Sequence, residues 1–328
     1  MKIFNVRVSR SSAKPIRRVL FNRIGSALAL SCLSLSAQAV ESNSSSYPVG
    51  VETNLSGIMF PEGATWLVYY SHYVAADSKD NSGKNNAALA HYNLRSDTVA
   101  LRLSYVWPGV KWLGANVESR FALSVPTIEL DLDIARPEAF GGPIDKGGTL
   151  TGLADLSVAP ILFGWHNKTL HQTAGIETYI PSGTYDKNEP VNAGHNFYQA
   201  APFYAVTWFP TDRLEASAKF RYAFNSPNHA TDYHSGNEFS TEFSAGYRVV
   251  PDLTLGLQGY IYRQTTDDRL NDQAVNGDGN RGSVNALGPY IHYRFTKNFA
   301  VITKYQQEFD AKNRSEGSRL WVQAKMPF

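Results

Sequence analysis

Apolar and polar residues alternate with a period of two along most of the chain. In residues 213–224, an apolar set that runs from Leu214 to Phe224 alternates with a set rich in charged residues. Successive side chains of a β-strand point to opposite faces, so this pattern predicts a strand with one apolar and one polar face. The same alternation recurs in residues 238–250 and 298–309, which indicates an all-β protein.

The pattern divides the chain into about twelve segments of about 12–15 residues, whereas an average strand has about 5–6 residues. Strands that cross a bilayer need about 9–11 residues and extend beyond it into the loops. The expected strands are residues 64–76, 95–107, 112–125, 149–164, 168–180, 195–209, 213–225, 237–250, 252–265, 282–296, 298–310 and 317–328.

The connections between these segments alternate between tight turns and long polar loops. Gly, Asn, Asp and Pro are frequent in both, as turn geometry requires. We expect tight turns at 107–111, 164–168, 210–212, 251–252 and 297–298, and long loops at 77–94, 126–148, 181–194, 226–236, 266–281 and 311–316. This layout is typical of an outer-membrane barrel with short periplasmic turns and long extracellular loops.

The physics of the bilayer favours the same architecture. Every backbone polar group must be paired in lipid, so only helices and closed barrels span it. The sequence has no apolar run of about 18 residues, the length that indicates a membrane helix. We therefore predict a closed antiparallel transmembrane β-barrel of about 12 strands over residues 64–328, located in the bacterial outer membrane.

Tryptophan positions support this prediction. All six are expected near strand ends, where an amphipathic ring favours the membrane interface. The alternative interpretation makes them core residues of a soluble β-protein. They are Trp66, Trp107, Trp112, Trp165, Trp208 and Trp321.

The first 39 residues have the three parts of a secretory signal peptide. Seven Lys and Arg residues accompany an apolar run, residues 24–35, which is followed by an A-x-A site with expected cleavage after Ala39. Cleavage removes seven of 31 basic residues and none of 29 acidic ones, so the net charge changes from +2 to −5. A lipoprotein signal that ends at Cys32, the only cysteine, and a frayed amphipathic helix are the alternatives. Residues 40–63 then form a flexible lead-in that is periplasmic or plugs the barrel.

The C-terminal strand carries a second signal. Residues Leu320, Val322, Ala324 and Met326 form one apolar face, and the chain ends on Phe328. A last strand that ends on an aromatic residue resembles the assembly signal of bacterial outer-membrane barrels. The expected partners are therefore the assembly machinery, which reads the C-terminal strand, and outer-membrane lipid and lipopolysaccharide.

The polar faces of the strands are expected to line the lumen. Acids and bases are mixed there, either as a structural salt-bridge network or as a constriction that selects the permeant. Segment 195–209 alternates poorly, so aromatic rings are expected to face both ways there. The lumen-lining candidates are Arg102, Glu118, Arg120, Asp155, Glu177, Lys219, Arg221, Glu242, Arg248, Arg294, Lys304 and Glu308.

Other motifs in the sequence give only weak evidence for a binding site. Residues 277–282 match G-x-G-x-x-G, but they are expected in a loop between strands, whereas a dinucleotide site needs a strand before and a helix after. The acids of that loop, including Asp268 and Asp278, do not have the spacing of an EF-hand, and their binding of divalent ions stays open. We predict no cofactor, no metal and no catalytic residue. With net charge +2, nucleic acid is not an expected partner.

Several stretches of the chain carry a specific likeness, of which G-L-A-D-L and P-S-G-x-Y-D are the most specific parts. They are residues 100–109, 152–160, 164–166, 180–186 and 192–196. Together they resemble an outer-membrane transporter family named for the meta-pathway of phenol degradation, and the likeness extends over about residues 50–328. The resemblance transfers no residue role.

The resemblance implies a channel that takes up small aromatic or hydrophobic compounds, so a small hydrophobic solute is the expected ligand. A lumen in which Tyr and Phe are interleaved with charges gives an aromatic ring a surface to bind. Two alternatives remain: a barrel enzyme that acts on lipid as hydrolase or acyltransferase, and a structural barrel with a plugged lumen.

Overall fold

A computed structural model describes residues 45–327. They belong to one compact unit, residues 40–328. The expected signal peptide with its cleavage site after Ala39, and the terminal Phe328, lie outside the described residues.

The described chain is built from strands and two short 3₁₀ helices. They are β1 (Gly63–Lys79), β2 (Leu89–Trp112), β3 (Ala115–Ile134), η1 (Glu138–Phe140), β4 (Ile144–Asp145), β5 (Gly148–Thr151), β6 (Leu156–His166), β7 (Leu170–Ile180), β8 (Gln199–Trp208), β9 (Leu214–Asn225), β10 (Tyr233–His234), β11 (Glu238–Val250), β12 (Leu253–Gln264), β13 (Arg269–Leu270), β14 (Gln273–Ala274), η2 (Val275–Gly277), β15 (Ser283–Arg294), β16 (Ala300–Lys312) and β17 (Arg314–Pro327). No helix among these residues is long and apolar enough to cross a membrane.

Twelve of the strands close into an antiparallel barrel, which confirms the predicted fold. Neighbours in sequence pair with one another around the sheet, and closure comes from β1, which pairs with both β2 and β17. In that last seam Thr65 is opposite Pro327 and Trp66 is opposite Met326. A closed sheet leaves no edge strand in the barrel, as spanning a bilayer requires.

Several of the predicted boundaries are wrong. Strands β2 and β3 extend into the loops expected at 77–94 and 126–148, and three further features differ. The turn expected at 107–111 lies instead at Leu113 and Gly114, because β2 takes up Pro108 and Gly109 in an irregular register between Val106 and Lys111. The strand expected at 149–164 is two strands, separated by residues 152–155. The loop expected at 311–316 is a tight turn at Asn313, whose positive φ of 48° allows β16 to reverse directly into β17.

Large apolar side chains cover the outside of the barrel. On β12, for example, Leu255 and Leu257 are 42% and 57% exposed, whereas the alternate residues Thr254 and Gln258 are buried. In a water-soluble protein such a surface would be unusual, but it suits a lipid-facing wall. Trp112 and Trp208 lie on this surface next to short connections, as interface residues do, and Trp107 is exposed on β2 before its end.

Trp321 is the exception among the tryptophans. It lies in the middle of β17, is only 4% exposed and packs inward with Leu67 and Tyr69. Its indole Nε1 donates to Gln306 Oε1 at 3.0 Å. The prediction that it lies near a strand end is therefore wrong.

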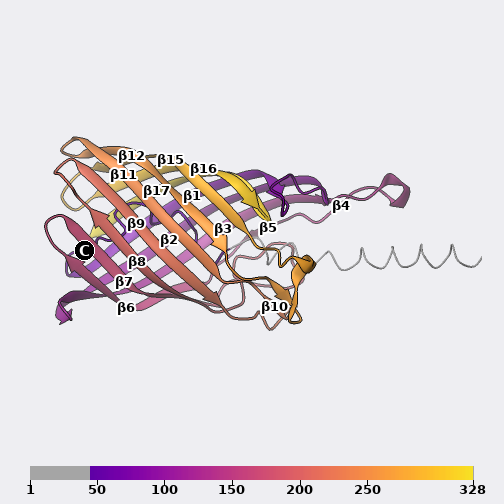
Figure 1. The fold of residues 1–328 in the computed structure, drawn as a ribbon, viewed down its shortest axis with the longest axis horizontal. Helices are drawn as coiled ribbons and strands as arrows, with labels where there is room; N and C mark the ends of the chain where they lie inside the picture. Colours follow the sequence, from indigo (N-terminus) through magenta and orange to yellow (C-terminus); the bar gives the residue numbers. More distant parts are fainter. Residues whose placement is uncertain (1–44, 328) are drawn as a thin grey trace, which may run out of the picture. The chain divides into compact units, whose positions relative to one another are not determined.

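The two ends of the barrel differ (Figure 1). The longer connections carry β4, β5 and the small sheet β10-β13-β14 at one end, and the C-terminus is at the other end, with the short turns. Residues 277–282 run from the last residue of η2 to the start of β15. The G-x-G-x-x-G string thus follows a 3₁₀ turn and precedes a strand, whereas a dinucleotide site needs a strand before it and a helix after it.

Candidate functional site: the barrel lumen

The inward faces of the strands carry buried charged residues. On β9, Glu215, Lys219 and Arg221 alternate with outward apolar residues and are at most 7% exposed. The other candidates that the structure buries are Glu118, Arg120, Asp155, Glu177, Glu242, Lys304 and Glu308. Acids and bases thus share the interior, where an unpaired charge would be costly.

These charges pair into local networks. Arg120 contacts Glu118, which also accepts a hydrogen bond from the Ser104 hydroxyl. Lys219 Nζ lies 3.1 Å from a Glu177 oxygen. The first network joins the neighbouring strands β2 and β3, and the second reaches past β8 to join β9 to β7.

Aromatic rings are interleaved with these charges. The Lys219 ammonium lies 4.5 Å from the centre of the Phe203 ring, within the range of a cation–π contact. Phe203 and Phe197 are buried whereas Tyr198 and Tyr204 are exposed, so aromatic side chains face both ways on this part of the chain, as the poor alternation predicts. The lumen therefore offers both charge and aromatic surface.

Residues 45–62, which we call the lumen segment, lie inside this wall. Gly50 and Glu52 donate their backbone N–H groups to the two Glu242 oxygens at 3.0 and 2.7 Å. Lys304 Nζ donates to the carbonyls of Gly50 and Val51, both at 2.7 Å. The wall thus supplies partners for a backbone that has no strand neighbour of its own.

The lumen segment touches the opposite wall just as closely. Gly57 donates its N–H to Thr207 Oγ1 at 3.0 Å, and its carbonyl accepts from Thr173 Oγ1 at 3.1 Å. A Cβ on Gly57 would lie 2.5 Å from the His171 carbonyl oxygen and from the Thr207 nitrogen. Only glycine permits this approach to the backbone of β7 and β8.

Glu52 is the acidic side chain through which the lumen segment meets the charged wall. Its carboxylate contacts Arg102 of β2 and Lys219 of β9, and Arg120 Nη1 of β3 lies 3.5 Å away. Sequence reasoning missed Glu52 because it is not on a strand. A signal was available, since Glu52 is the only charged residue in 45–61.

Three candidates lie at the ends of the barrel rather than deep within it. Arg294 ends β15 and pairs with Asp252 at 2.9 Å, with about half of each side chain exposed. Arg248 donates to the Asp212 carbonyl in the adjacent short turn. Asp155 precedes β6, in the gap that the sequence assigned to a strand.

Asp155 fastens the long loops to one another. Its two oxygens accept the backbone N–H groups of Gly183 at 3.0 Å and of His195 at 2.8 Å. Burial alone would raise the pKa of the Asp155 carboxyl, but the hydrogen bonds and charge of His195, with the Gly183 N–H, hold it below the usual value. We call these two hydrogen bonds to Asp155 the clasp. The clasp joins three of the stretches that carry the family resemblance: 152–160, 180–186 and 192–196.

Two acids of the loop between β12 and β15, Asp267 and Asp268, are engaged within the protein. Asp268 accepts hydrogen bonds from the Tyr233 hydroxyl at 2.6 Å and the Gly236 N–H at 2.8 Å, and Asp267 pairs with Arg281. Across residues 45–327, no group of three His, Cys, Asp or Glu side chains is arranged to hold a metal ion.

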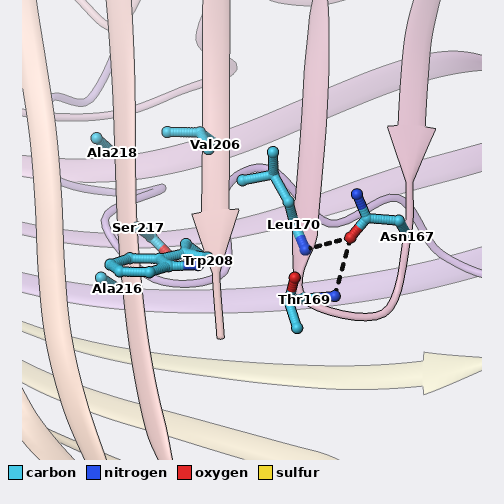
Figure 2. Close-up of a pocket in the computed structure, with 8 residues that line it drawn as sticks. All are labelled: Asn167, Thr169, Leu170, Val206, Trp208, Ala216, Ser217 and Ala218. Atoms are coloured by element: carbon cyan, nitrogen blue, oxygen red, sulfur yellow. Dashed lines mark hydrogen bonds between the residues drawn. The ribbon is translucent and has the colours of Figure 1, made fainter. Parts of the chain in front are cut away.

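A separate depression of about 570 Å³ lies on the outer surface at the turn end of β7, β8 and β9 (Figure 2). Trp208 lies beside Ala216 and Ser217, while Asn167 Oδ1 accepts the backbone N–H groups of Thr169 and Leu170 and so fixes the turn. Leucine, valine, alanine and tryptophan dominate its lining, so it belongs to the apolar outer face.

The closed sheet, the apolar exterior and the polar interior define an outer-membrane β-barrel. Residues 76–324 match the model of the family of the MetA-pathway of phenol degradation, and the chain belongs to this family. No curated protein sequence matches the chain.

One solved structure has the same fold, and two others are less similar. An outer membrane channel from Pseudomonas putida F1 superposes with a TM-score of 0.68 at 16% identity, over 82% of this chain and 97% of that one. The transport unit of the autotransporter AIDA-I from Escherichia coli follows with a TM-score of 0.47 at 10% identity, over 82% and 91%. A FadL homologue from Pseudomonas aeruginosa gives 0.44 at 9% identity, over 85% and 93%.

Proposed function

We propose that the protein is an outer-membrane channel for the uptake of small aromatic or hydrophobic compounds. Membership of a family named for phenol degradation supports the substrate class, and the similar barrel from Pseudomonas putida F1 is described as a channel. The observation that carries the proposal is the lumen, in which Phe203 lies against the Lys219 ammonium and Tyr69 against the Arg102 guanidinium. Such a wall gives a planar solute a binding surface at each step of its passage.

The lumen segment lies inside the barrel, so passage of a solute depends on the position of this segment. It is held by hydrogen bonds and ion pairs to side chains of the wall, without a strand pairing of its own. Contacts of this kind are exchangeable with water, whereas a continuous β-ladder is not easily opened. We therefore propose that solute passes when this segment moves aside.

The enzyme alternative has its strongest candidate in His72 and Asp97, which are 2.8 Å apart on β1 and β2. Hydrolysis by such a pair needs a nucleophilic hydroxyl that is hydrogen-bonded to the second nitrogen of the imidazole ring. Among residues 45–327 no serine or threonine hydroxyl bonds to His72, and Asp97 also accepts from the Tyr70 hydroxyl. This geometry favours the channel.

Purified protein in planar bilayers and in liposomes tests the proposal. We expect conductance steps, and we expect swelling with phenols and aromatic acids that exceeds swelling with sugars of similar size. Absence of steps together with absence of swelling for every solute would show a structural, plugged barrel instead.

A further inference from the structure

The part of the lumen wall that holds the Glu52 carboxylate, which we call the Glu52 site, is rich in cations. Three cations from three strands converge on the Glu52 side chain: Arg102 and Lys219 in direct contact, and Arg120 at 3.5 Å. Arg102 depends on it most, because no other carboxylate among the described residues pairs with Arg102. Lys219 and Arg120 each keep a second acid in the wall.

The wall also supplies rings beside these cations. Phe203 lies 4.5 Å from Lys219 Nζ, and the Arg102 guanidinium lies 5.7 Å from the centre of the Tyr69 ring. The lumen segment adds its own ring there, since Tyr47 lies 4.7 Å from the same ammonium. Glu52 and Tyr47 together thus present a carboxylate and a phenol ring to the wall, which are the groups of an aromatic acid.

The site also has donors that Glu52 does not use. The Tyr69 hydroxyl and Arg102 Nε are buried and have no hydrogen-bond partner within residues 45–327. Buried donors are normally paired, and a ligand with a further oxygen atom would pair them. The wall therefore has more capacity for an anion than the lumen segment satisfies.

Withdrawal of Glu52 alone would leave the Arg102 guanidinium without a carboxylate and would remove one of the two acids beside Lys219 and beside Arg120, which is unfavourable for cations in the barrel interior. Withdrawal becomes feasible when another carboxylate takes its place, because binding and displacement are then thermodynamically linked. We propose that Glu52 occupies a binding site for aromatic carboxylates, and that such a solute opens the lumen by replacing the Glu52 side chain. This inference rests on the proposed channel function and names its substrate class.

Displacement is measurable without conduction. Ser56 is in the lumen segment and its hydroxyl has no partner in the described part of the chain, so Ser56→Cys is a mild change. In a chain with Cys32→Ser, labelling of this cysteine by a water-soluble thiol reagent reports exposure of the segment. We expect benzoate to raise the labelling rate by about tenfold or more, and neutral benzyl alcohol to leave it unchanged.

Two glutamate variants complete the test. Glu52→Gln should give fast labelling and frequent opening without benzoate, with no further response to it. Glu62→Gln removes an exposed carboxylate just outside the site and should behave as the parent chain does.

The inference is overturned if benzoate and benzyl alcohol act equally, or if Glu52→Gln and Glu62→Gln cannot be distinguished. Passage of neutral and anionic aromatic solutes at equal rates would leave the channel function standing while rejecting this site. Labelling that responds to benzoate in a protein that conducts nothing would support the site and reject the channel.

Discussion

The Glu52 carboxylate and the Arg102 guanidinium form an ion pair that joins the lumen segment to the barrel wall. The two residues are 50 positions apart in sequence, and the β1 strand separates them. Their contact places the one charge of residues 45–61 among the charges of the wall. The predictions below concern the segment, the outer wall, the loops and the N-terminus in turn.

Gly57→Ala should loosen the lumen segment. The added methyl group would lie 2.5 Å from backbone atoms of β7 and β8. Hydrogen-bonded strand backbone cannot shift to relieve such a clash without loss of stability. Overpacking of this kind costs about 1–3 kcal/mol. We expect larger or more frequent conductance steps, with heat-modifiable gel migration unchanged. Ser56→Ala, which removes an unpaired hydroxyl, is the matched control, and an equal effect of both would contradict the packing argument.

Ala218→Arg should destabilise the barrel. Ala218 is on the outer face of β9, where an arginine near the bilayer midplane costs roughly 2–4 kcal/mol. Denaturant unfolding of the protein in lipid measures the loss. Ala87→Arg makes the same change in an exposed loop and should cost almost nothing. Ser217, the inward neighbour, is no neutral control because its hydroxyl accepts the Leu55 N–H.

Asp155→Asn should free the long loops. An amide in place of the carboxylate loses one acceptor oxygen for the Gly183 and His195 N–H groups. Faster proteolysis within residues 181–198 is expected at neutral pH. Asn188→Ala lies in the same loop outside the clasp, and should change the cleavage rate much less.

The pH dependence of the same clasp follows from its lowered pKa. A carboxyl with a depressed folded pKa stabilises the protein above the unfolded value of about 3.9, and the stabilisation is lost as pH falls through the folded pKa. Loop protection, measured by hydrogen exchange, should therefore persist to about pH 4 and disappear only below it. Loss of protection well above pH 4 would contradict control by the Asp155 carboxylate.

Export should produce a chain that begins at Val40. The basic region, apolar run and A-x-A site predict cleavage after Ala39. Intact-mass measurement of protein from outer membranes checks the site. A mass that includes a lipid at Cys32 would support the lipoprotein alternative.

Much of the wall was predictable because side-chain direction in a strand depends only on parity. Once Leu214 and Phe224 are taken as outward, Lys219 and Arg221 must face inward, and the structure buries both. The prediction fails where a strand is apolar on both faces. In β1, Trp66 to Tyr70 give no alternation, so the inward direction of Leu67 and Tyr69 could not be read from the pattern.

The sequence by itself determined a twelve-stranded membrane barrel, since the two-residue period and the turn residues act locally along the chain. Only the tertiary structure decided what fills the lumen. The contacts of Glu52 with Arg102 and Lys219, and of Gly50 with Glu242, join residues 50 to 192 positions apart. No periodicity encodes such contacts, because they depend on barrel closure bringing distant strands around one segment.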